Sequence, residues 1–454
     1  MRVHRIAWWL LAAGAALGQP EPAASPGQPE EPPRSEYAGP AILSRGLGAL
    51  LNPDRELLKL RPFASVQGIY DSGLTAISVD ETGKLHSRDA LGTEADFGVT
   101  GYHSWRRTLL GMQYQGRLRH YTRETYYDGM DNILTLNAVH RASRRVTVQV
   151  APAVASYSRG YFAPEAGSAY YSPELMALAG GELFDSRVNV VFGSGRLVYQ
   201  RTARLSVSLG GNGFATRRHS RALAGVTGYS ATGDLAYRVS RYQTIGVDYH
   251  FMHYDFQRVF GDTDAQGIGF NYALQMGRHW TLALRAGGYR VEISRLERVP
   301  LDPVIAAIVG QGVAISTSYR QLYIPAFNGQ LVRRYRRGAA TFEYTRSISP
   351  GNGLYLTANY EQGGAGISYR GTRRASVFVH GAAQQYRALV QDLGRFRSYW
   401  GGLGMSYSLA HDLSLSVTLG ARHYDVRNTQ LDRISYRAAV GLTYSPGEVP
   451  FSLW

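Results

Sequence analysis

The sequence predicts an all-β fold: a single transmembrane, antiparallel, up-and-down β-barrel of about 18 strands. Apolar and polar residues alternate with a period of two in one segment after another from Arg61 onward. Polar tight turns recur at intervals of about 38 residues, enough for two strands, one tight turn and one longer connection. No apolar run near 18 residues follows position 18, which argues against membrane-spanning helices.

The first 60 residues differ in composition from the rest of the chain. A positively charged start and an apolar run at residues 6–17 predict an export signal peptide that is cleaved near Gly18. Residues 19–40 contain seven of the chain's 18 prolines, so we expect a spacer without a packed core. The predicted organisation is a signal peptide at 1–18, a Pro/Glu-rich periplasmic spacer with a short helix candidate at 19–60, and the barrel at 61–454.

The strands are recognised by their alternation, which is clearest at 205–209, 245–251 and 413–421. Eight turns join such segments in pairs, and further strands at 63–70 and 434–444 bring the total to eighteen. The predicted turns contain Arg106, Ser143, Thr202, Ser240, Arg278, Gly351, Thr372 and Ala410. An even strand number with long connections on one side favours a membrane barrel. A secreted sandwich would show no such preference, and a propeller would show recurring blade motifs.

One face of the predicted strands is apolar and suits lipid, since an arginine there at the bilayer midplane costs about 2–4 kcal/mol. The candidates for this face are Leu205, Val207, Leu209, Ile268, Phe270, Tyr272, Leu274, Leu282, Leu284, Leu354, Leu356, Leu413, Leu415, Val417, Leu419, Ile434, Tyr436, Val440 and Leu442. Aromatic residues near strand ends predict interfacial girdles. They are Tyr70, Trp105, Tyr237, Trp280, Tyr360, Tyr369, Trp400, Tyr407 and Tyr444.

The opposite face is polar and predicts a water-filled, slightly positive lumen. Its pore-lining candidates are Arg117, Arg119, Asp234, Arg238, Asp248, His250, Arg285, Glu343, Glu361, Arg370, Arg422 and Arg437. We expect at least half of these charges to form ion pairs that stiffen the wall. The excess of arginines over acids predicts modest anion selectivity.

Two long insertions interrupt the repeat, one at 158–186 and one at 294–337, and both are predicted to be extracellular. Each contains a short helix with a proline near its start and a glycine at its end, at 172–180 and at 302–310. The second helix is almost wholly apolar, which favours folding into the barrel mouth over packing above the membrane. The arginine-rich run at 333–337 is a candidate contact for lipopolysaccharide phosphates, or else a solvated loop end.

The composition and motifs give no support for an enzyme, a cofactor or a metal centre. The chain has no cysteine and none of the common nucleophile, zinc-protease, phosphate-loop or dinucleotide motifs. His250 and His253 point to opposite faces of a strand, and Asp262 with Asp264 is a weak calcium candidate. The arginines are dispersed over an exported chain, which argues against nucleic acid as a partner.

The signal peptide, the alternating strands and units such as Ala236-Tyr237-Arg238-Val239-Ser240 resemble the bacterial outer-membrane β-barrel, porin-like families. The aromatic end Phe451-Ser452-Leu453-Trp454 adds to this resemblance, although Pro446 and Pro450 interrupt the terminal strand that porins usually have. Either Tyr444 ends the last strand and a tail follows, or the tail itself is the assembly signal.

The resemblance implies an outer-membrane pore for passive diffusion of small polar solutes, with anions as a candidate class. Its expected partners are outer-membrane lipid, lipopolysaccharide and the barrel-assembly machinery. One alternative is a barrel component of a surface-polysaccharide or other export system. A second is an outer-membrane lipid-modifying enzyme with a Ser/His pair on the lipid face; His423 is predicted to be outward, but the sequence names no nucleophile beside it.

Overall fold

The computed structural model describes residues 58–79, 85–158, 187–221, 223–300, 313–371, 374–389, 395–426, 432–446 and 449–451. The predicted signal peptide, nearly all of the spacer and both predicted loop helices lie outside these residues. Within them, no helix has the length and apolar character needed to cross a membrane. The one helical element among the described residues is a 3-10 turn, η1, at Thr125–Tyr127.

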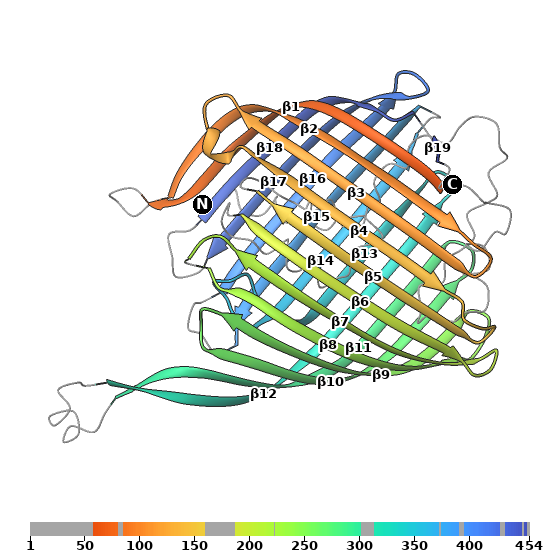
Figure 1. Ribbon diagram of the computed structural model, residues 1–454, viewed down its shortest axis with the longest axis vertical. Coiled ribbons are helices and arrows are strands. Elements are labelled where there is room, and N and C mark those ends of the chain that lie inside the picture. The colour runs from red at the N-terminus through yellow and green to blue at the C-terminus, as the bar shows by residue number, and fades with distance from the viewer. Residues whose placement is uncertain are drawn as a thin grey trace, which may run out of the picture.

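Antiparallel strands account for almost all of the described chain (Figure 1). They are β1 (Leu58–Val79), β2 (Leu85–Ser104), β3 (Thr108–Tyr121), β4 (Gly129–His140), β5 (Val146–Tyr157), β6 (Val188–Gln200), β7 (Leu205–Arg218), β8 (Gly225–Arg238), β9 (Gln243–Gln257), β10 (Gly261–Met276), β11 (Trp280–Pro300), β12 (Val313–Tyr335), β13 (Gly338–Ser349), β14 (Ala358–Arg370), β15 (Ala375–Ala388), β16 (Arg395–Ser408), β17 (Leu413–Val426), β18 (Asp432–Tyr444) and β19 (Val449–Phe451).

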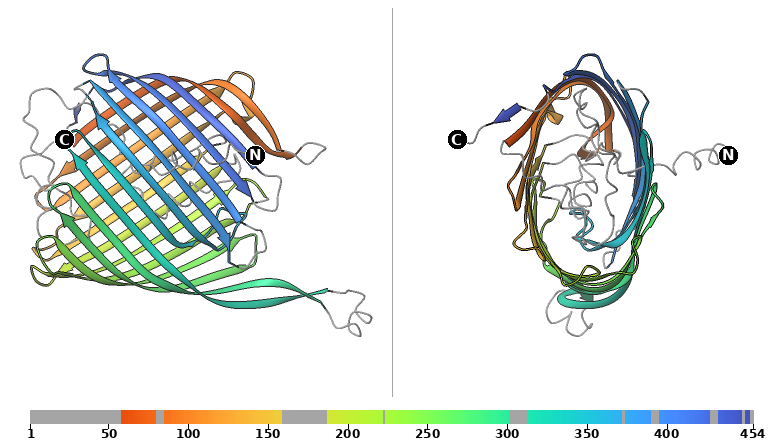
Figure 2. Two further views of the ribbon diagram at one scale, coloured as in Figure 1. Left: turned by 180° about the vertical axis from the view of Figure 1, so that it is seen from behind. Right: turned by 90° about the vertical axis from the view of Figure 1, so that its right-hand side faces the viewer.

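Each strand from β1 to β18 pairs with the next, and β18 pairs back with β1, from Ala64 opposite Tyr444 to Asp71 opposite Arg437. The predicted closed barrel of eighteen strands is therefore confirmed, and its cross-section is oval in the end view (Figure 2). Tyr444 ends the last barrel strand, as one of the two sequence alternatives has it. The chain then returns as β19, which pairs with the start of β1, so Pro450 does not prevent a short strand there.

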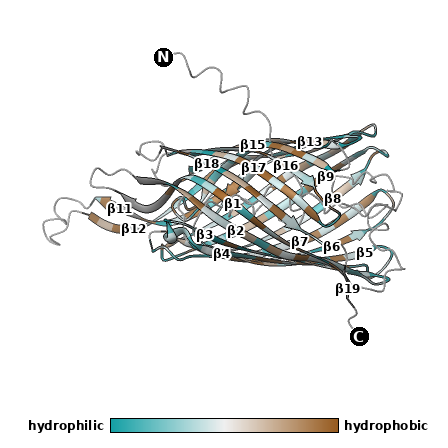
Figure 3. Cartoon of the chain, turned by 90° about the horizontal axis from the view of Figure 1, so that it is seen from above, coloured by the Kyte–Doolittle hydropathy of each residue, from teal (hydrophilic) through white to brown (hydrophobic). Residues whose placement is uncertain are grey.

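The period-two pattern sorts the side chains between the outside and the inside of the barrel. On β18, Ile434, Tyr436, Val440 and Leu442 are exposed on the outer surface, whereas Ser435 and its neighbours of the same parity face inward. Figure 3 shows the same alternation of apolar and polar segments along the strands. Because every inter-strand hydrogen bond is closed within the ring, this outer surface can contact lipid without an unpaired sheet edge.

Two of the predicted lipid-facing residues, Leu354 and Leu356, are instead in the β13–β14 connection and pack against buried residues. The predicted turn around Gly351 is correspondingly wrong. The tight turn lies at Arg336 and Arg337, between β12 and β13. This change places 350–357 among the connections at the other end of the barrel, which we call the long-connection end although its β9–β10 connection is only 258–260. The eight turns that follow even-numbered strands all lie at the opposite end, and we call these the short turns.

The insertion predicted at 294–337 is mostly strand. β11 and β12 pair without interruption from Trp280 opposite Arg333 to Pro300 opposite Val313, and this hairpin extends beyond the rim (Figure 1). β12 continues the alternating pattern in this extension, because Ile315, Tyr319 and Tyr323 are exposed on one face. The arginine-rich run at 333–337 therefore lies at the short-turn end, opposite to the end at which lipopolysaccharide was expected.

Seven aromatic side chains form a ring at the short-turn end of the outer surface, at or next to the ends of even-numbered strands. They are Trp105, Tyr199, Tyr237, Tyr335, Tyr369, Tyr407 and Tyr444, each between 36% and 53% exposed. Four residues predicted for a girdle do not belong to this ring. Tyr70 is exposed on the outer surface of β1 away from the short-turn end, and Trp280 is half-buried at that end. Tyr360 is buried on the inside, and Trp400 has the inward parity of the buried residue Ser398.

The separation of short turns from long connections predicts the accessibility of single cysteines introduced into this cysteine-free chain. Arg123→Cys and Arg221→Cys are in connections at one end, and Arg144→Cys and Arg241→Cys are in turns at the other. In intact Gram-negative cells, a membrane-impermeant maleimide should label only the first two, since periplasmic turns of such barrels are the short ones. All four should react after lysis. Labelling of one residue from each end in intact cells would contradict this topology.

Candidate pore lining

The densest group of charges on the inner wall lies where the barrel closes. We call it the seam cluster, and its members are Asp71, Glu94, Asp96, Arg117, Arg119, Asp131 and Arg437. They come from β1, β2, β3, β4 and β18, so residues from both ends of the chain meet there. Only Arg117, Arg119 and Arg437 are among the residues predicted from the sequence.

Glu94 is the centre of the seam cluster and is 1% exposed. Its Oε2 accepts hydrogen bonds from Arg437 Nη2 at 2.8 Å and from Arg119 Nε at 2.9 Å. Its Oε1 lies 3.4 Å from Arg117 Nε and accepts a hydrogen bond from Gln67 at 2.7 Å. A carboxylate removed from water to this extent is tolerated because charged donors replace its hydration.

The remaining acids of the seam cluster are also hydrogen-bonded. Asp96 Oδ1 lies 2.6 Å from Arg117 Nε, and Asp71 Oδ2 accepts from Tyr121 Oη at 2.5 Å. Asp131 accepts hydrogen bonds from the backbone N–H and hydroxyl of Ser158, at 2.7 and 2.8 Å. The cluster thus ties β1 to its neighbours on both sides.

Strand register explains why these side chains meet. Glu94 is directly opposite Arg119, and Asp96 is opposite Arg117, so two acids two residues apart face two arginines two residues apart. The closing pair of strands places Asp71 opposite Arg437. Directly opposite residues on one face of a sheet have Cβ atoms about 5 Å apart, within reach of these side chains.

Two smaller groups pair further charges along the wall. Arg285 Nη2 lies 2.6 Å from Asp248 Oδ2, and Asn271 donates to the same carboxylate at 2.8 Å. Asp234 accepts from Ser208 at 2.7 Å and forms an ion pair with Arg196, which the sequence reasoning missed. Four of the seven predicted arginines, Arg117, Arg119, Arg285 and Arg437, are therefore paired with carboxylates.

Four other predicted lining residues have inward parity on their strands: Arg238, His250, Glu343 and Arg370. Arg238 and Arg370 are the last residues of β8 and β14, at the short-turn end. The ring of His250 meets that of Tyr289 edge-on, with 6.2 Å between ring centroids.

Arg422 also faces inward, and its Nε lies 3.5 Å from the hydroxyl of the buried residue Ser398.

Glu361 differs from the other predicted lining residues. It has the parity of Ile367 and Tyr369, which are exposed on the outer surface of β14. It forms an ion pair with Arg346, the residue directly opposite on β13, at 3.4 Å. Both lie near the long-connection end, so their outward position is close to the edge of the barrel rather than at its middle.

The sequence analysis predicted a polar inner wall, but part of that wall is apolar. Toward the long-connection end, β4 to β13 contribute a buried apolar cluster to the inside. It includes Phe192, Phe214, Tyr254, Val291 and Ile324, and Leu356 of the β13–β14 connection packs against it. On these strands the interior is apolar toward the long-connection end, and charges such as Asp234 and Arg285 lie closer to the short-turn end. On β1–β4 and β18, by contrast, the charged seam cluster itself lies toward the long-connection end.

The connection at 350–357 bridges the inside of the barrel. Tyr355 is fully buried and packs with Tyr386 and Phe396 on the inner face of β15 and β16. On the other side, the Gly353 carbonyl accepts a hydrogen bond from the Ala224 amide at 3.0 Å. The hydroxyls of Thr357 and Thr263 are 2.5 Å apart, which links the connection to β10.

Backbone geometry explains the glycines in this connection. Gly351 and Gly353 have φ of +72° and +87°, where side chains are rarely tolerated. A Cβ on Gly351 would lie only 1.7 Å from the Tyr355 carbonyl oxygen. Burial also raises the pKa of Tyr355, with the Asp425 carboxylate as a smaller cause, so the phenol stays neutral. Among the described residues, the connection that folds into the barrel is therefore 350–357, where the sequence analysis predicted a tight turn.

The histidines are arranged as the alternation predicts. His250 faces inward and His253 outward, where Nδ1 of His253 lies 2.8 Å from Asp264 Oδ1. Asp262 completes a group whose potential ligand atoms all lie within 4.8 Å of one another.

His423 is also outward. It stacks on Tyr399 and has Ile434 on its other side, so no nucleophile is directly opposite it.

Comparisons with known proteins found no matching family model and no matching curated protein. The chain is similar to several solved structures of comparable length. OccK5 (OpdH) of Pseudomonas aeruginosa is 13% identical, with 87% of this chain and 99% of that chain covered and a TM-score of 0.42. OccAB1 of Acinetobacter baumannii is 10% identical over 87% and 99%, with a TM-score of 0.41. A BenF-like porin of Pseudomonas fluorescens Pf-5 is 10% identical over 85% and 98%, also with a TM-score of 0.41.

Proposed function

We propose that the protein is an outer-membrane pore for passive diffusion of small polar solutes. The observation that carries this proposal is the closed ring of eighteen strands with ionised side chains on its inner wall and apolar ones outside. Barrels of 16–18 strands are wide enough to leave an aqueous channel. The connection at 350–357 narrows this interior and sets the size of solute that passes.

Anions are the favoured solute class. Six acids of the inner wall are held in ion pairs, and the same pairs offset the charges of Arg285 and Arg437. Arg238 and Arg370 face inward at the short-turn end, where the inner surface is polar. A positive potential in a low-dielectric channel raises the local concentration of anions.

The surrounding membrane and assembly partners are part of the same proposal. Outer-membrane lipid covers the apolar outer surface, with lipopolysaccharide at the long-connection side. The barrel-assembly machinery inserts the chain after export. No observation favours the export-system or lipid-enzyme alternatives over a pore.

Planar-bilayer recordings of the refolded protein test this function. We expect ohmic conductance steps and a reversal potential that shows anion preference across a KCl gradient. The preference should shrink as salt rises, because the Debye length falls from about 10 Å at 0.1 M to about 3 Å at 1 M. Absence of conductance, or cation preference, would contradict the proposal.

A matched pair of variants tests the origin of the selectivity. Arg238→Ser with Arg370→Ser removes inward charges at the short-turn end and should reduce the anion preference. Arg333→Ser is the control, because Arg333 lies at the same end but outside, over the rings of Trp280 and Tyr335 at 4.9 and 4.8 Å. Equal effects per charge removed in the control and the double variant would show that a general loss of charge is responsible.

A further inference from the structure

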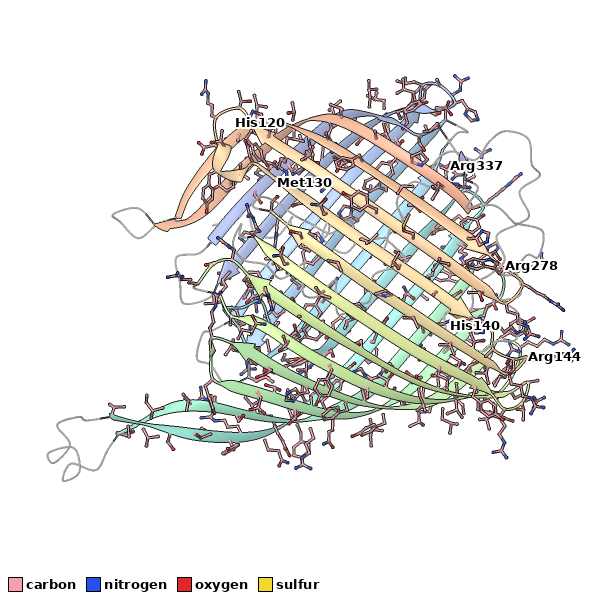
Figure 4. All side chains as sticks on the ribbon, in the orientation of Figure 1. His120, Met130, His140, Arg144, Arg278 and Arg337 are labelled. Atoms are coloured by element: carbon pink, nitrogen blue, oxygen red, sulfur yellow. The ribbon has the colours of Figure 1, made fainter. Side chains whose placement is uncertain are left out.

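The chain's arginines are concentrated at one end of the barrel. Seven of its eight short turns contain arginine among the described residues, and their only acid is Asp412. We call these side chains the arginine ring: Arg106, Arg107, Arg141, Arg144, Arg145, Arg201, Arg204, Arg241, Arg278, Arg336, Arg337 and Arg374. All are exposed except Arg141, which is half-buried. Figure 4 shows Arg144, Arg278 and Arg337 at the same end.

The other end has a different balance of charge. Its described connections contain four arginines and two acids, which are Arg123, Arg187, Arg221, Arg258, Glu124 and Asp128. Further acids face outward on the strands near this end, at Asp255, Asp262, Asp264 and Glu292. The excess of positive charge is therefore far larger at the short-turn rim, where the described turns contain twelve arginines and one acid.

The arginine ring follows directly on the ring of outward aromatic side chains at the short-turn end. Tyr199 is two residues before Arg201, and Tyr335 is next to Arg336. A strand rises about 3.3 Å per residue, so these guanidinium-bearing positions lie about 3–7 Å beyond the aromatic ring along the strand. Aromatic belts sit at the level of the lipid headgroups, which puts the arginines at or just beyond the phosphates.

The distribution of the arginine ring around the barrel indicates what binds to it. A folded protein would contact one side of the rim, whereas the ring includes turns all the way from β2–β3 to β14–β15. The lipid leaflet is the partner that surrounds a barrel on every side. Guanidinium groups bind phosphate through paired hydrogen bonds, and arginines near a membrane surface are attracted to anionic lipid by about 1 kcal/mol each.

From this placement we propose that the arginine ring binds the phosphates of anionic phospholipid headgroups in the leaflet at the short-turn end. Arg333 supports the proposal, since its guanidinium is held over two aromatic rings, Trp280 and Tyr335, at the same level of the outer surface. The interaction is independent of solute passage and fixes the depth of the barrel in the membrane.

A charge-matched pair of variants tests this proposal. The ring variant replaces Arg144, Arg201, Arg241 and Arg278 with glutamine, and the control replaces the exposed residues Arg123, Arg187, Arg217 and Arg221 at the other end. Both variants lose four charges. Native mass spectrometry of the folded protein in detergent, with added phosphatidylglycerol or phosphatidylcholine, measures the binding of each lipid. The heat-dependent gel mobility of each variant checks that the barrel is closed.

The wild type should bind phosphatidylglycerol more tightly than phosphatidylcholine, and this preference should weaken as salt rises. The ring variant should bind phosphatidylglycerol at least about tenfold more weakly, while the control should resemble the wild type. Equal binding of the two lipids by the wild type, or equal losses in both variants, would overturn the proposal. Binding of dextran sulfate, a soluble polyanion, is measured in the same way. If the ring variant loses dextran sulfate binding but keeps its phosphatidylglycerol binding, the arginine ring binds a soluble polyanion and the proposal is overturned.

Discussion

Replacing Arg437 with leucine is expected to lower the free energy of unfolding by about 3–5 kcal/mol. Arg437 bridges Asp71 and Glu94, at 3.3 and 2.8 Å, and both carboxylates are at most 2% exposed. The substitution leaves these acids buried with one charged donor fewer, and it removes a link across the seam. Urea unfolding of the refolded barrel in detergent micelles, followed by tryptophan fluorescence, measures the loss.

Arg241→Leu is the control for this measurement, because Arg241 is exposed in a short turn. Surface substitutions of this kind change stability by no more than about 0.5 kcal/mol. A similar loss in both variants would show that the seam cluster does not stabilise the closed barrel. Arg437→Lys should recover part of the loss, since an ammonium keeps the charge but cannot reproduce the two contacts of the guanidinium.

An arginine placed on the outer surface near the bilayer midplane is expected to cost about 2–4 kcal/mol. Val417 is the test position, because it is opposite Val440, which is 53% exposed on the outer surface. Its neighbour Ser416 points to the inside, where an arginine can remain hydrated. Val417→Arg should therefore lower the unfolding free energy of the barrel in lipid vesicles far more than Ser416→Arg does. Equal losses would mean that the faces have been assigned incorrectly.

Much of the fold could be predicted from the sequence because a strand with lipid on one face and water on the other alternates apolar and polar residues. Strands such as β17 and β18 have strong contrast between apolar and polar positions, so their boundaries and faces are readable. The predicted turn at Gly351 failed for a local reason. Pro350-Gly351-Asn352 has the residues of a tight turn, but here they fold a long connection inward. The real turn at Arg336 and Arg337 contains neither glycine nor proline.

The seam cluster was only partly predictable. Arg117, Arg119 and Arg437 lie on strands with clear alternation, whereas β2 has too few apolar residues for its faces to be assigned. The acids Glu94 and Asp96 were therefore missed, although their spacing of two residues was a usable signal. The apolar part of the inner surface could not be predicted from the sequence for a different reason. A lumen lined by side chains from ten strands is a property of closure, which no single strand reveals.

Closure of the barrel also has a kinetic consequence. Asp71 and Arg437 are 366 positions apart, so their contact closes nearly the whole chain, at an entropic cost that grows with the logarithm of loop length. β18 is the last barrel strand to leave the translocation machinery, and until it arrives the edge of β1 has an unpaired row of backbone groups. A slip of one residue in this final pairing would turn Arg437 outward into lipid. Only the correct register places Arg437 opposite Asp71 and within reach of Glu94, so correct closure gains two buried ion pairs that a misregistered closure lacks.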